Sequence, residues 1–76
     1  MNAIITGSDL RAMRIVSGLT TMQMASAAGV KTRKTYENWE KGQGTPNINQ
    51  FIWMASRCGV NASEFIANCE GRKEYN

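Results

Sequence analysis

Residues that begin and end helices divide this sequence into short segments. Thr6 and Thr20 each precede an apolar segment, and each is followed three residues later by a side chain that can complete a capping box at a helix N-terminus. Gly18 and Gly29 stand where these two segments end, as glycine does after a helix C-terminus. Such closely spaced caps and stops leave room only for short helices, and no segment shows the alternation expected of a β-strand.

Three further helices are predicted from the same signals. Their candidate N-caps are Thr32 for the third helix, Asn47 for the fourth, and Asn61 or Ser63 for a short fifth. Apolar residues recur at helical spacing, and the side chains expected to face the core are, in chain order, Leu10, Met13, Met24, Ala25, Ala28, Tyr36, Trp39, Ile48, Phe51, Ile52, Ala55, Cys58, Phe65 and Ile66. We therefore predict an all-α fold, a compact five-helix bundle in one domain of residues 1–70, followed by a polar tail at residues 71–76.

The composition excludes several kinds of function. The 76 residues include no His, which rules out zinc sites of the Cys/His type and acid–base catalysis by histidine. The sequence shows neither paired carboxylates on one helix face nor a phosphate-binding loop, so we predict that the protein is not an enzyme and needs no cofactor. A net charge of +3 permits a nucleic-acid partner without establishing one.

The two cysteines help to predict the cellular compartment of the protein. Cys58 and Cys69 are too few for a disulfide framework, and reduced thiols fit them better, although a bridge between the two stays open. No apolar run approaches the roughly 20 residues that span a bilayer. Residues 1–6 lack the basic start and apolar core of a signal peptide. We expect a cytoplasmic protein with no membrane association.

Two short helices joined by a glycine-containing turn form the most informative part of the sequence. Ala25 is small enough to let the second and third helices approach closely, and Gly29 can adopt the positive φ of a sharp turn. Val30, Tyr36 and Trp39 can pack inside the angle between these helices and fix it. A rigid angle of this kind lets one helix enter the major groove of DNA while its neighbour spans the phosphates. The arrangement is typical of a DNA-binding helix-turn-helix.

The segment from Leu10 to Ile66 resembles the Cro/repressor (Xre-type) helix-turn-helix family of phage and bacterial regulators. The matching residues are Leu10, Met13, Arg14, Gly18, Leu19, Thr20, Met24, Ala25, Gly29, Val30, Trp39, Glu40, Gly42, Pro46, Phe51, Ile52, Met54, Ala55, Gly59 and Val60. The run Tyr-Glu-Asn-Trp-Glu-Lys-Gly at 36–42 is similar to the end of that family's recognition helix. The resemblance implies a lambda-repressor-like fold, binding to duplex DNA, and a structural ion pair between Arg14 and Glu40.

The turn before the third helix differs from the common family pattern. Between Val30 and Tyr36 the chain holds one residue more, so either the turn is longer or the recognition helix begins one residue later. A phage-associated subset of the family, which includes repressors of anti-CRISPR operons, is similar in its longer turn and its Trp-Glu-x-Gly ending. Family members often have Gln at the position of Thr21.

The first turn of the expected recognition helix is cationic. Cations at a helix N-terminus oppose the helix dipole, so Arg33 and Lys34 indicate a ligand rather than a gain in helix stability. Arg33 can form paired hydrogen bonds with O6 and N7 of guanine, and Lys34 can do the same or bind phosphate. Thr35 can contact a thymine methyl group or a phosphate, and Asn38 can pair with N6 and N7 of adenine. The alternative is that all four are solvated surface residues.

Contacts with the DNA backbone are expected from residues around this helix. They are Thr20, Thr21, Lys31, Lys41 and Gln43. For Thr20 a plain capping role is an equal alternative, and Lys41 and Gln43 are equally well explained as ordinary surface residues.

Trp53 is the candidate contact between two copies of the chain. Its helical angle turns it partly away from the core face of the fourth helix. An exposed Trp often marks a partner surface, and Ile4, Ile5 or Phe65 could extend it. The alternative is a Trp that folds over the edge of a small core.

These features predict a transcriptional regulator, most simply a repressor, that binds a palindromic duplex-DNA operator as a homodimer. The main alternative is an antitoxin-type module that binds a toxin partner and regulates its own operon. Binding of single-stranded RNA is a second alternative, and it requires Tyr36 and Trp39 to be exposed for base stacking.

Overall fold

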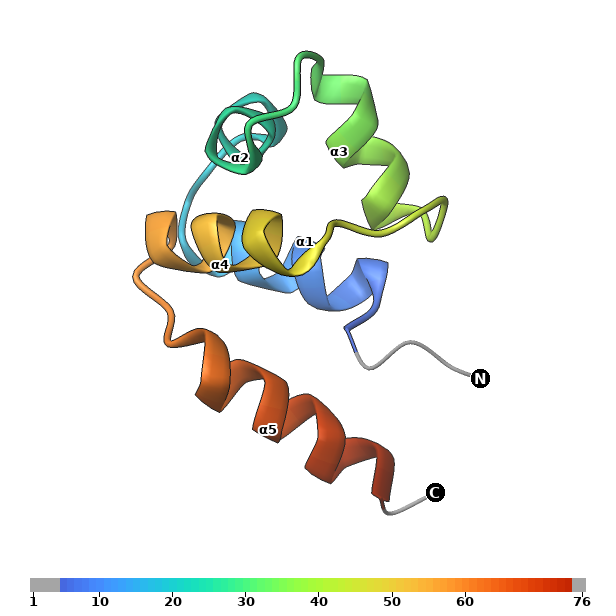
Figure 1. Ribbon diagram of the computed structural model, residues 1–76, viewed down its shortest axis with the longest axis vertical. Coiled ribbons are helices and arrows are strands. Elements are labelled where there is room, and N and C mark those ends of the chain that lie inside the picture. Colours follow the sequence, from blue (N-terminus) through green and yellow to red (C-terminus); the bar gives the residue numbers. More distant parts are fainter. Residues whose placement is uncertain (1–4, 75–76) are drawn as a thin grey trace.

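The computed structural model describes the backbone of residues 5–74 and the side chains of residues 5–69. This part of the chain forms five α-helices and no strand (Figure 1). The helices are α1 (Gly7–Val16), α2 (Thr21–Ala28), α3 (Arg33–Glu40), α4 (Ile48–Arg57) and α5 (Ala62–Glu74). The prediction of a small all-α helix bundle is confirmed.

Side-chain caps fix the N-termini of most of these helices. Thr6 and Thr20 each accept a hydrogen bond from the backbone N–H of the third helical residue and form a capping box, as does Asn47 at the start of α4. At α5 the cap is Asn61, whose Oδ1 accepts a backbone N–H at 3.0 Å. Of the two caps proposed for this helix, Asn61 is therefore used and Ser63 is not.

α5 is longer than the short helix that the sequence predicts. It contains 13 residues, so residues 71–74, expected to form a polar tail, continue the helix. The reason is that a single glycine inside a helix, here Gly71, is unfavourable by only about 1 kcal/mol relative to alanine, and the Arg, Lys and Glu that follow favour the helix. Residues 75 and 76 of the predicted tail lie outside the described residues.

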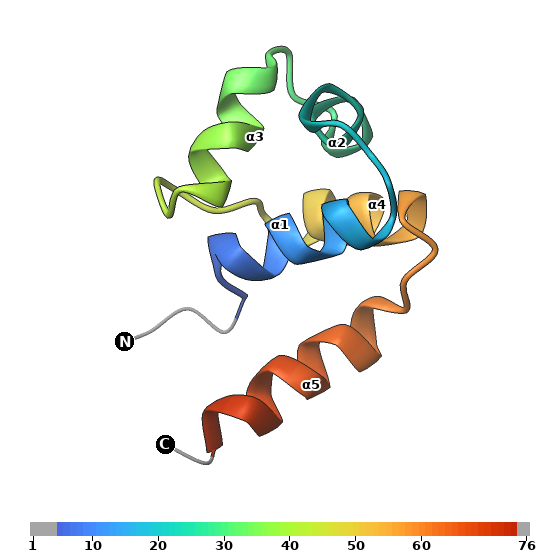
Figure 2. The same ribbon diagram turned by 180° about the vertical axis from the view of Figure 1, so that it is seen from behind.

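The arrangement of the helices places α3 at one end of the molecule. Figures 1 and 2 show α2 and α3 at this end and α5 at the opposite end, with α1 and α4 between them. α2 packs against both α3 and α4, whereas α1 packs against α3 and α5 against α4. α3 is thus supported by two helices, and the side chains of Arg33 and Lys34 at its start remain exposed.

Side chains from α1 to α4 form the core. The largest of its fully buried side chains are Leu10, Met24, Tyr36 and Met54. The Tyr36 hydroxyl donates a hydrogen bond to the Leu10 carbonyl at 3.2 Å, which satisfies the polar end of this side chain inside the core. Phe65 of α5 covers the core from outside, with its ring centroid 5.8 Å from that of Phe51.

The buried face of α4 is rotated relative to the predicted stripe. Ile48 and Ile52, expected to face the core, are 60% and 42% exposed, whereas Met54 is fully buried. Positions 51, 54, 55 and 58 form the inward stripe, which follows the helical spacing i, i+3, i+4 and i+7. The predicted stripe had the same period but lay further around the helix, so periodicity alone could not choose between the two.

The cysteines and the apolar character of the helices bear on the environment of the protein. No disulfide joins Cys58 and Cys69, so the bridge left open as an alternative is not observed. Cys69 is buried, and the Cys58 S–H points to the Met24 Sδ at 3.7 Å. Within the described part of the chain, no helix has the length and apolar character needed to cross a membrane.

Gly7 allows the start of α1 to approach the end of α3. A Cβ built at Gly7 would lie 2.5 Å from the Trp39 carbonyl oxygen and would also overlap the Glu40 carbonyl oxygen. Both are backbone atoms, so they cannot move aside as the end of a flexible side chain can. Nothing in the local pattern around Gly7 indicates this contact, because it joins residues far apart in the sequence.

Candidate nucleic-acid interface

α2, the turn after it and α3 form a helix-turn-helix. Gly29 is the C-cap of α2, and its φ of 76° lies in the left-handed region that glycine adopts without strain. The Val30 N–H donates to the Ala25 carbonyl at 3.1 Å and ties the start of the turn to the last turn of α2. Because Thr32 is the N-cap of α3, the turn comprises residues 29–32 and α3 begins at Arg33.

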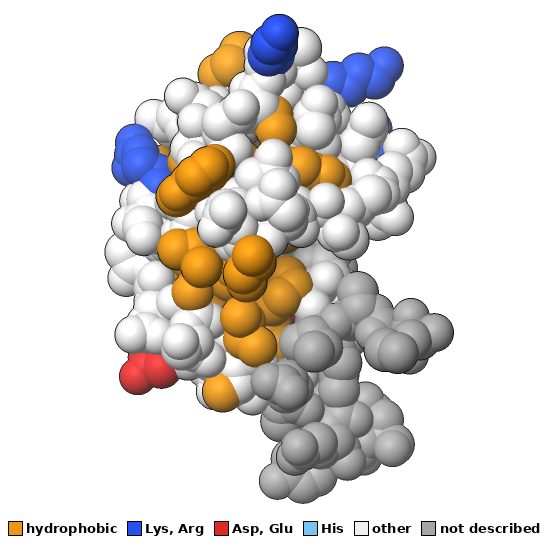
Figure 3. All heavy atoms as spheres, in the orientation of Figure 1, with side chains coloured by type: hydrophobic (Ala, Val, Ile, Leu, Met, Phe, Trp, Pro, Cys, Tyr) orange, Lys and Arg blue, Asp and Glu red, His pale blue; other side chains and the backbone are white. Residues whose placement is uncertain are grey.

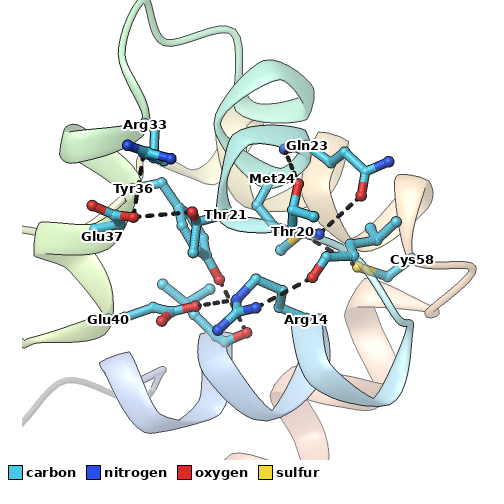
Figure 4. A network of polar contacts seen from close by, with 12 residues as sticks. Arg14, Thr20, Thr21, Gln23, Met24, Arg33, Tyr36, Glu37, Glu40 and Cys58 are labelled. Carbon is cyan, nitrogen blue, oxygen red and sulfur yellow. Dashed lines mark hydrogen bonds and ion pairs between the residues drawn. The ribbon is translucent and has the colours of Figure 1, made fainter.

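An ion pair fixes α1 to the last turn of α3 (Figure 4). The Arg14 Nε lies 2.7 Å from the Glu40 Oε2, and both side chains are mostly buried. The Arg14 Nη1 also donates to the Leu19 carbonyl at 3.2 Å, so one guanidinium joins α1, α3 and the connection between α1 and α2. The hydrogen bond with Glu40 raises the pKa of Arg14 above its ordinary value. The structure therefore contains the ion pair that the resemblance implies.

Tyr36 and Trp39 hold α3 against the core. They are 0% and 7% exposed, and their rings meet edge to face with centroids 6.2 Å apart. Burial raises the pKa of Tyr36, and the nearby Glu40 carboxylate raises it further. Because base stacking needs accessible ring faces, this burial does not favour the RNA-binding alternative.

The first turn of α3 is cationic and has no side-chain cap. Thr32 occupies the predicted N-cap position, but its hydroxyl lies 3.3 Å from the Thr35 hydroxyl and caps no backbone N–H. Arg33 and Lys34 follow with exposed side chains, and no acidic residue lies in this turn. The turn therefore presents positive side chains together with the backbone N–H groups of a helix N-terminus, a combination that favours anions.

The other predicted DNA contacts lie on α3 or next to one of its two ends. Thr35 and Asn38 are half-buried on α3, Lys31 is exposed before it, and Lys41 and Gln43 are exposed beyond its end. Figure 3 shows Lys and Arg side chains projecting at this end of the molecule. The Gln43 N–H donates to the Asn38 carbonyl at 2.8 Å, which folds the chain after α3 back onto the helix.

The two threonines at the start of α2 are engaged within the protein. The Thr20 Oγ1 accepts the Gln23 N–H at 3.1 Å, which is the capping role that the sequence left as an alternative. The Thr21 Oγ1 donates to the Glu37 Oε2 at 3.0 Å. The Thr21 O–H is therefore already used within the protein, whereas the Thr20 hydroxyl accepts a hydrogen bond and can still donate one.

Glu37 is a residue of this face that the sequence patterns did not single out. Its Oε2 accepts the Thr21 hydroxyl and also lies 3.6 Å from the Arg33 Nε (Figure 4). The i, i+4 spacing of Arg33 and Glu37 is a signal that could have indicated this ion pair. No sequence signal indicates the contact with Thr21, which comes from the packing of α2 against α3.

Trp53 is one of three large apolar residues that are exposed on α4. Its side chain is 52% exposed, and its Cζ3 would lie 3.7 Å from a Cβ built at Gly29. Ile48 and Ile52 are also exposed on this helix, and Figure 3 shows the hydrophobic surface over α4 and between α4 and α5. We refer to Ile48, Ile52 and Trp53 as the α4 patch.

Two of the three residues that were expected to extend the exposed surface around Trp53 pack elsewhere. Ile5 and Phe65 are partly buried and pack against the protein's own core. Ile4 lies outside the described residues. The other large apolar residues exposed on α4 are Ile48 and Ile52, the two residues that the sequence had assigned to the core.

No protein-family model and no curated protein matches this chain. The chemistry of the site therefore follows from its own side chains. A guanidinium, an ammonium group and a carboxamide, carried by Arg33, Lys34 and Asn38 on one exposed helix, can donate hydrogen bonds to base edges or to phosphate oxygens.

Proposed function

We propose that this chain is a sequence-specific regulator of transcription that binds double-stranded DNA, most simply a repressor of the Cro/repressor type. The observation that carries the proposal is the exposed, uncapped, cationic first turn of α3 on a helix-turn-helix. Helix stability alone would favour acidic residues in this turn. Arg33 and Lys34 are therefore better explained by an anionic ligand.

In this proposal α3 lies in the major groove with its first turn against the base edges. Arg33 donates paired hydrogen bonds to O6 and N7 of a guanine. Asn38 donates to N7 of an adenine and accepts from its N6 amino group. Lys34 and Thr35 contact neighbouring bases or phosphates. The Arg14–Glu40 pair and the buried Tyr36 support this geometry, because they fix α3 against α1 and the core.

Phosphate contacts come from both ends of the recognition helix. α3 has eight residues and is therefore about 12 Å long. Lys31 precedes it, and Lys41 and Gln43 follow it, so donors lie at each end. Thr21 contributes less than its sequence position suggests, because its hydroxyl donates to Glu37 within the protein.

A homodimer on a palindromic operator completes the proposal. One short helix reads only part of an operator, and a second copy places another α3 about 34 Å away, one turn of DNA along the axis. The α4 patch is the proposed contact between the copies. Ile48, Ile52 and Trp53 are apolar and exposed, so two copies of the chain can bury them against each other. The protein would act on DNA in the cytoplasm of a prokaryotic cell.

Selection of binding sites from random duplex DNA tests this function. The expected result is a palindromic consensus that binds two chains. Arg33→Ala should weaken the preference for that consensus, whereas Arg57→Ala should retain it, because Arg57 is an exposed cation on α4. Recovery of no consensus from the duplex library would contradict the proposal.

An antitoxin-type module is the second candidate, and the exposed α4 patch is the observation that favours it. A protein partner would then cover Trp53. Co-purification of a small protein that is lost with Trp53→Ser would support this candidate. If the chain acts as a homodimeric repressor, the same substitution should change its stoichiometry on DNA instead.

A further inference from the structure

Glu37 lies beside Arg33 on the helix that the proposed function places in the major groove. Its side chain is 39% exposed and that of Arg33 is 59% exposed, so a ligand can reach both. A carboxylate at this place repels phosphate and weakens general attraction to DNA. Its presence in the cationic face therefore needs an explanation other than affinity.

The carboxylate is held in place from the neighbouring helix. Thr21 is the first residue of α2, and its hydroxyl donates to the Glu37 Oε2 at 3.0 Å, so this contact bridges the two helices of the helix-turn-helix. The same oxygen lies 3.6 Å from the Arg33 Nε. Because Thr21 fixes the carboxylate, Glu37 acts on Arg33 as a negative charge of defined position.

The position of Glu37 beside the guanidinium determines which N–H donors of Arg33 remain available to DNA. The carboxylate lies on the Nε side, and the two terminal nitrogens can then form the parallel pair of donors that matches O6 and N7 of guanine. An unrestrained Arg would lose more side-chain entropy on binding and could reach phosphates instead. Restraint at Nε thus favours base contact over phosphate contact.

We propose that Glu37 is a positioning residue that makes Arg33 selective for guanine, and that Thr21 holds Glu37 in the required place. The inference rests on the proposed DNA-binding function and names the contact that gives it specificity. Glu37 lowers the affinity for arbitrary duplexes by charge repulsion and raises discrimination at one base pair. Glu37 therefore contributes to sequence specificity and not to affinity.

Replacement of Glu37 by Gln tests this role, since Gln keeps the size of the side chain and removes its charge. We expect E37Q to bind arbitrary duplex DNA more tightly than the wild type. At the base pair contacted by Arg33, preference for guanine should fall about tenfold, the scale of one bidentate contact. T21V should lower the same preference by a smaller factor, because it releases the carboxylate without removing it.

Two controls separate positioning from a general charge effect. E64Q removes an exposed carboxylate from α5, far along the chain from the helix-turn-helix, and should leave the guanine preference unchanged. In the R33A background, E37Q should cause no further loss of discrimination, because Glu37 acts through Arg33. An E37Q preference within about twofold of the wild type, or an equal loss in the R33A background, would overturn the inference.

The side-chain Nε–H resonance of Arg33 provides a readout without DNA. It should shift in E37Q and in T21V relative to the wild type, because both variants change the charge or position of its neighbour. An unchanged resonance in E37Q would overturn the positioning role whatever the DNA measurements show. Failure of the wild type to select any duplex sequence would instead overturn the proposed function on which the inference rests.

Discussion

The Arg14 Nε lies 2.7 Å from the Glu40 Oε2, and this contact joins α1 to the last turn of the helix proposed to read DNA. The same guanidinium donates to the Leu19 carbonyl, so it also fixes the connection that leads into α2. The pair therefore holds both helices of the helix-turn-helix relative to α1. Its loss should affect stability and the orientation of α3 together.

Arg14→Ala should lower the free energy of unfolding by about 2–3 kcal/mol, because it leaves the mostly buried Glu40 carboxylate without its charged partner. Urea denaturation followed by Trp fluorescence measures this change. The matched control is Arg57→Ala, an exposed cation whose removal should change stability by less than about 0.5 kcal/mol. A similarly small effect for Arg14→Ala would show that the ion pair does not stabilise the fold.

Gly7→Ala should destabilise the protein by about 1–3 kcal/mol or more, although alanine is the better helix former. The reason is that the new Cβ would overlap the carbonyl oxygens of Trp39 and Glu40, which belong to the backbone of α3. Thermal unfolding measures the effect. Ser8→Ala, at the next and exposed position of α1, should be neutral or stabilising. A rise in melting temperature for Gly7→Ala would mean that α1 and α3 can separate at this point at little cost.

The elements that the sequence predicted correctly depend on local signals. Thr6, Thr20 and Asn47 cap helices because each needs only the backbone of its own first turn. Gly29 ends α2 for a similarly local reason, the positive φ of its turn. The Arg14–Glu40 contact is long-range, and the residue pattern alone did not predict it. It came from the resemblance to the helix-turn-helix family.

The features that could not be predicted from the sequence arise from packing between segments that are distant along the chain. The rotation of α4, which buries Met54 and exposes Ile52, depends on the shape of the surface that α2 presents to it. The contact of Thr21 with Glu37 likewise exists only because α2 and α3 meet. Residues 71–76 were expected to form a polar tail, but polar composition alone does not end a helix, and α5 continues to Glu74.

The stability of the protein should fall as the pH rises above the ordinary phenol pKa of 10.0. Burial raises the pKa of Tyr36 in the folded protein, so above that pH the unfolded chain releases a proton that the folded protein retains. This contribution is fully present below pH 10.0, and it is lost with increasing pH by up to about 1.4 kcal/mol per unit. Urea denaturation at a series of pH values measures the slope.

Tyr36→Phe is the control for this pH dependence. It removes the phenol and its hydrogen bond to the Leu10 carbonyl, so it should be less stable than the wild type by about 1 kcal/mol at neutral pH. Its stability should then fall less steeply than that of the wild type at alkaline pH, since the phenol of Tyr36 is absent. Parallel slopes for the two proteins would contradict a role for Tyr36.

If the chain binds DNA as proposed, Arg33→Ala should change sequence preference, whereas Lys31→Ala should change affinity for all duplexes. Arg33→Ala should reduce operator affinity by about 1–3 kcal/mol and relax sequence preference at one base pair. Lys31→Ala should weaken binding to all duplexes alike and reduce the salt dependence of binding by about one phosphate contact. Titrations of operator and random duplexes at several salt concentrations measure both effects. Equal losses of Arg33→Ala on operator and random DNA would count against base reading by Arg33.

If the chain forms the proposed homodimer, Trp53→Lys should weaken its self-association by about tenfold or more, the order expected for a central aromatic contact. The substitution places a charge in the α4 patch, and in a symmetric contact each copy would bring its own charge close to the other. Sedimentation equilibrium measures the dimerisation constant, and circular dichroism checks that the helices persist. Val16→Lys is the matched control, since it adds the same charge at a residue that is 88% exposed on α1. If Val16→Lys dissociates the dimer as strongly as Trp53→Lys does, the contact between copies lies elsewhere than the α4 patch.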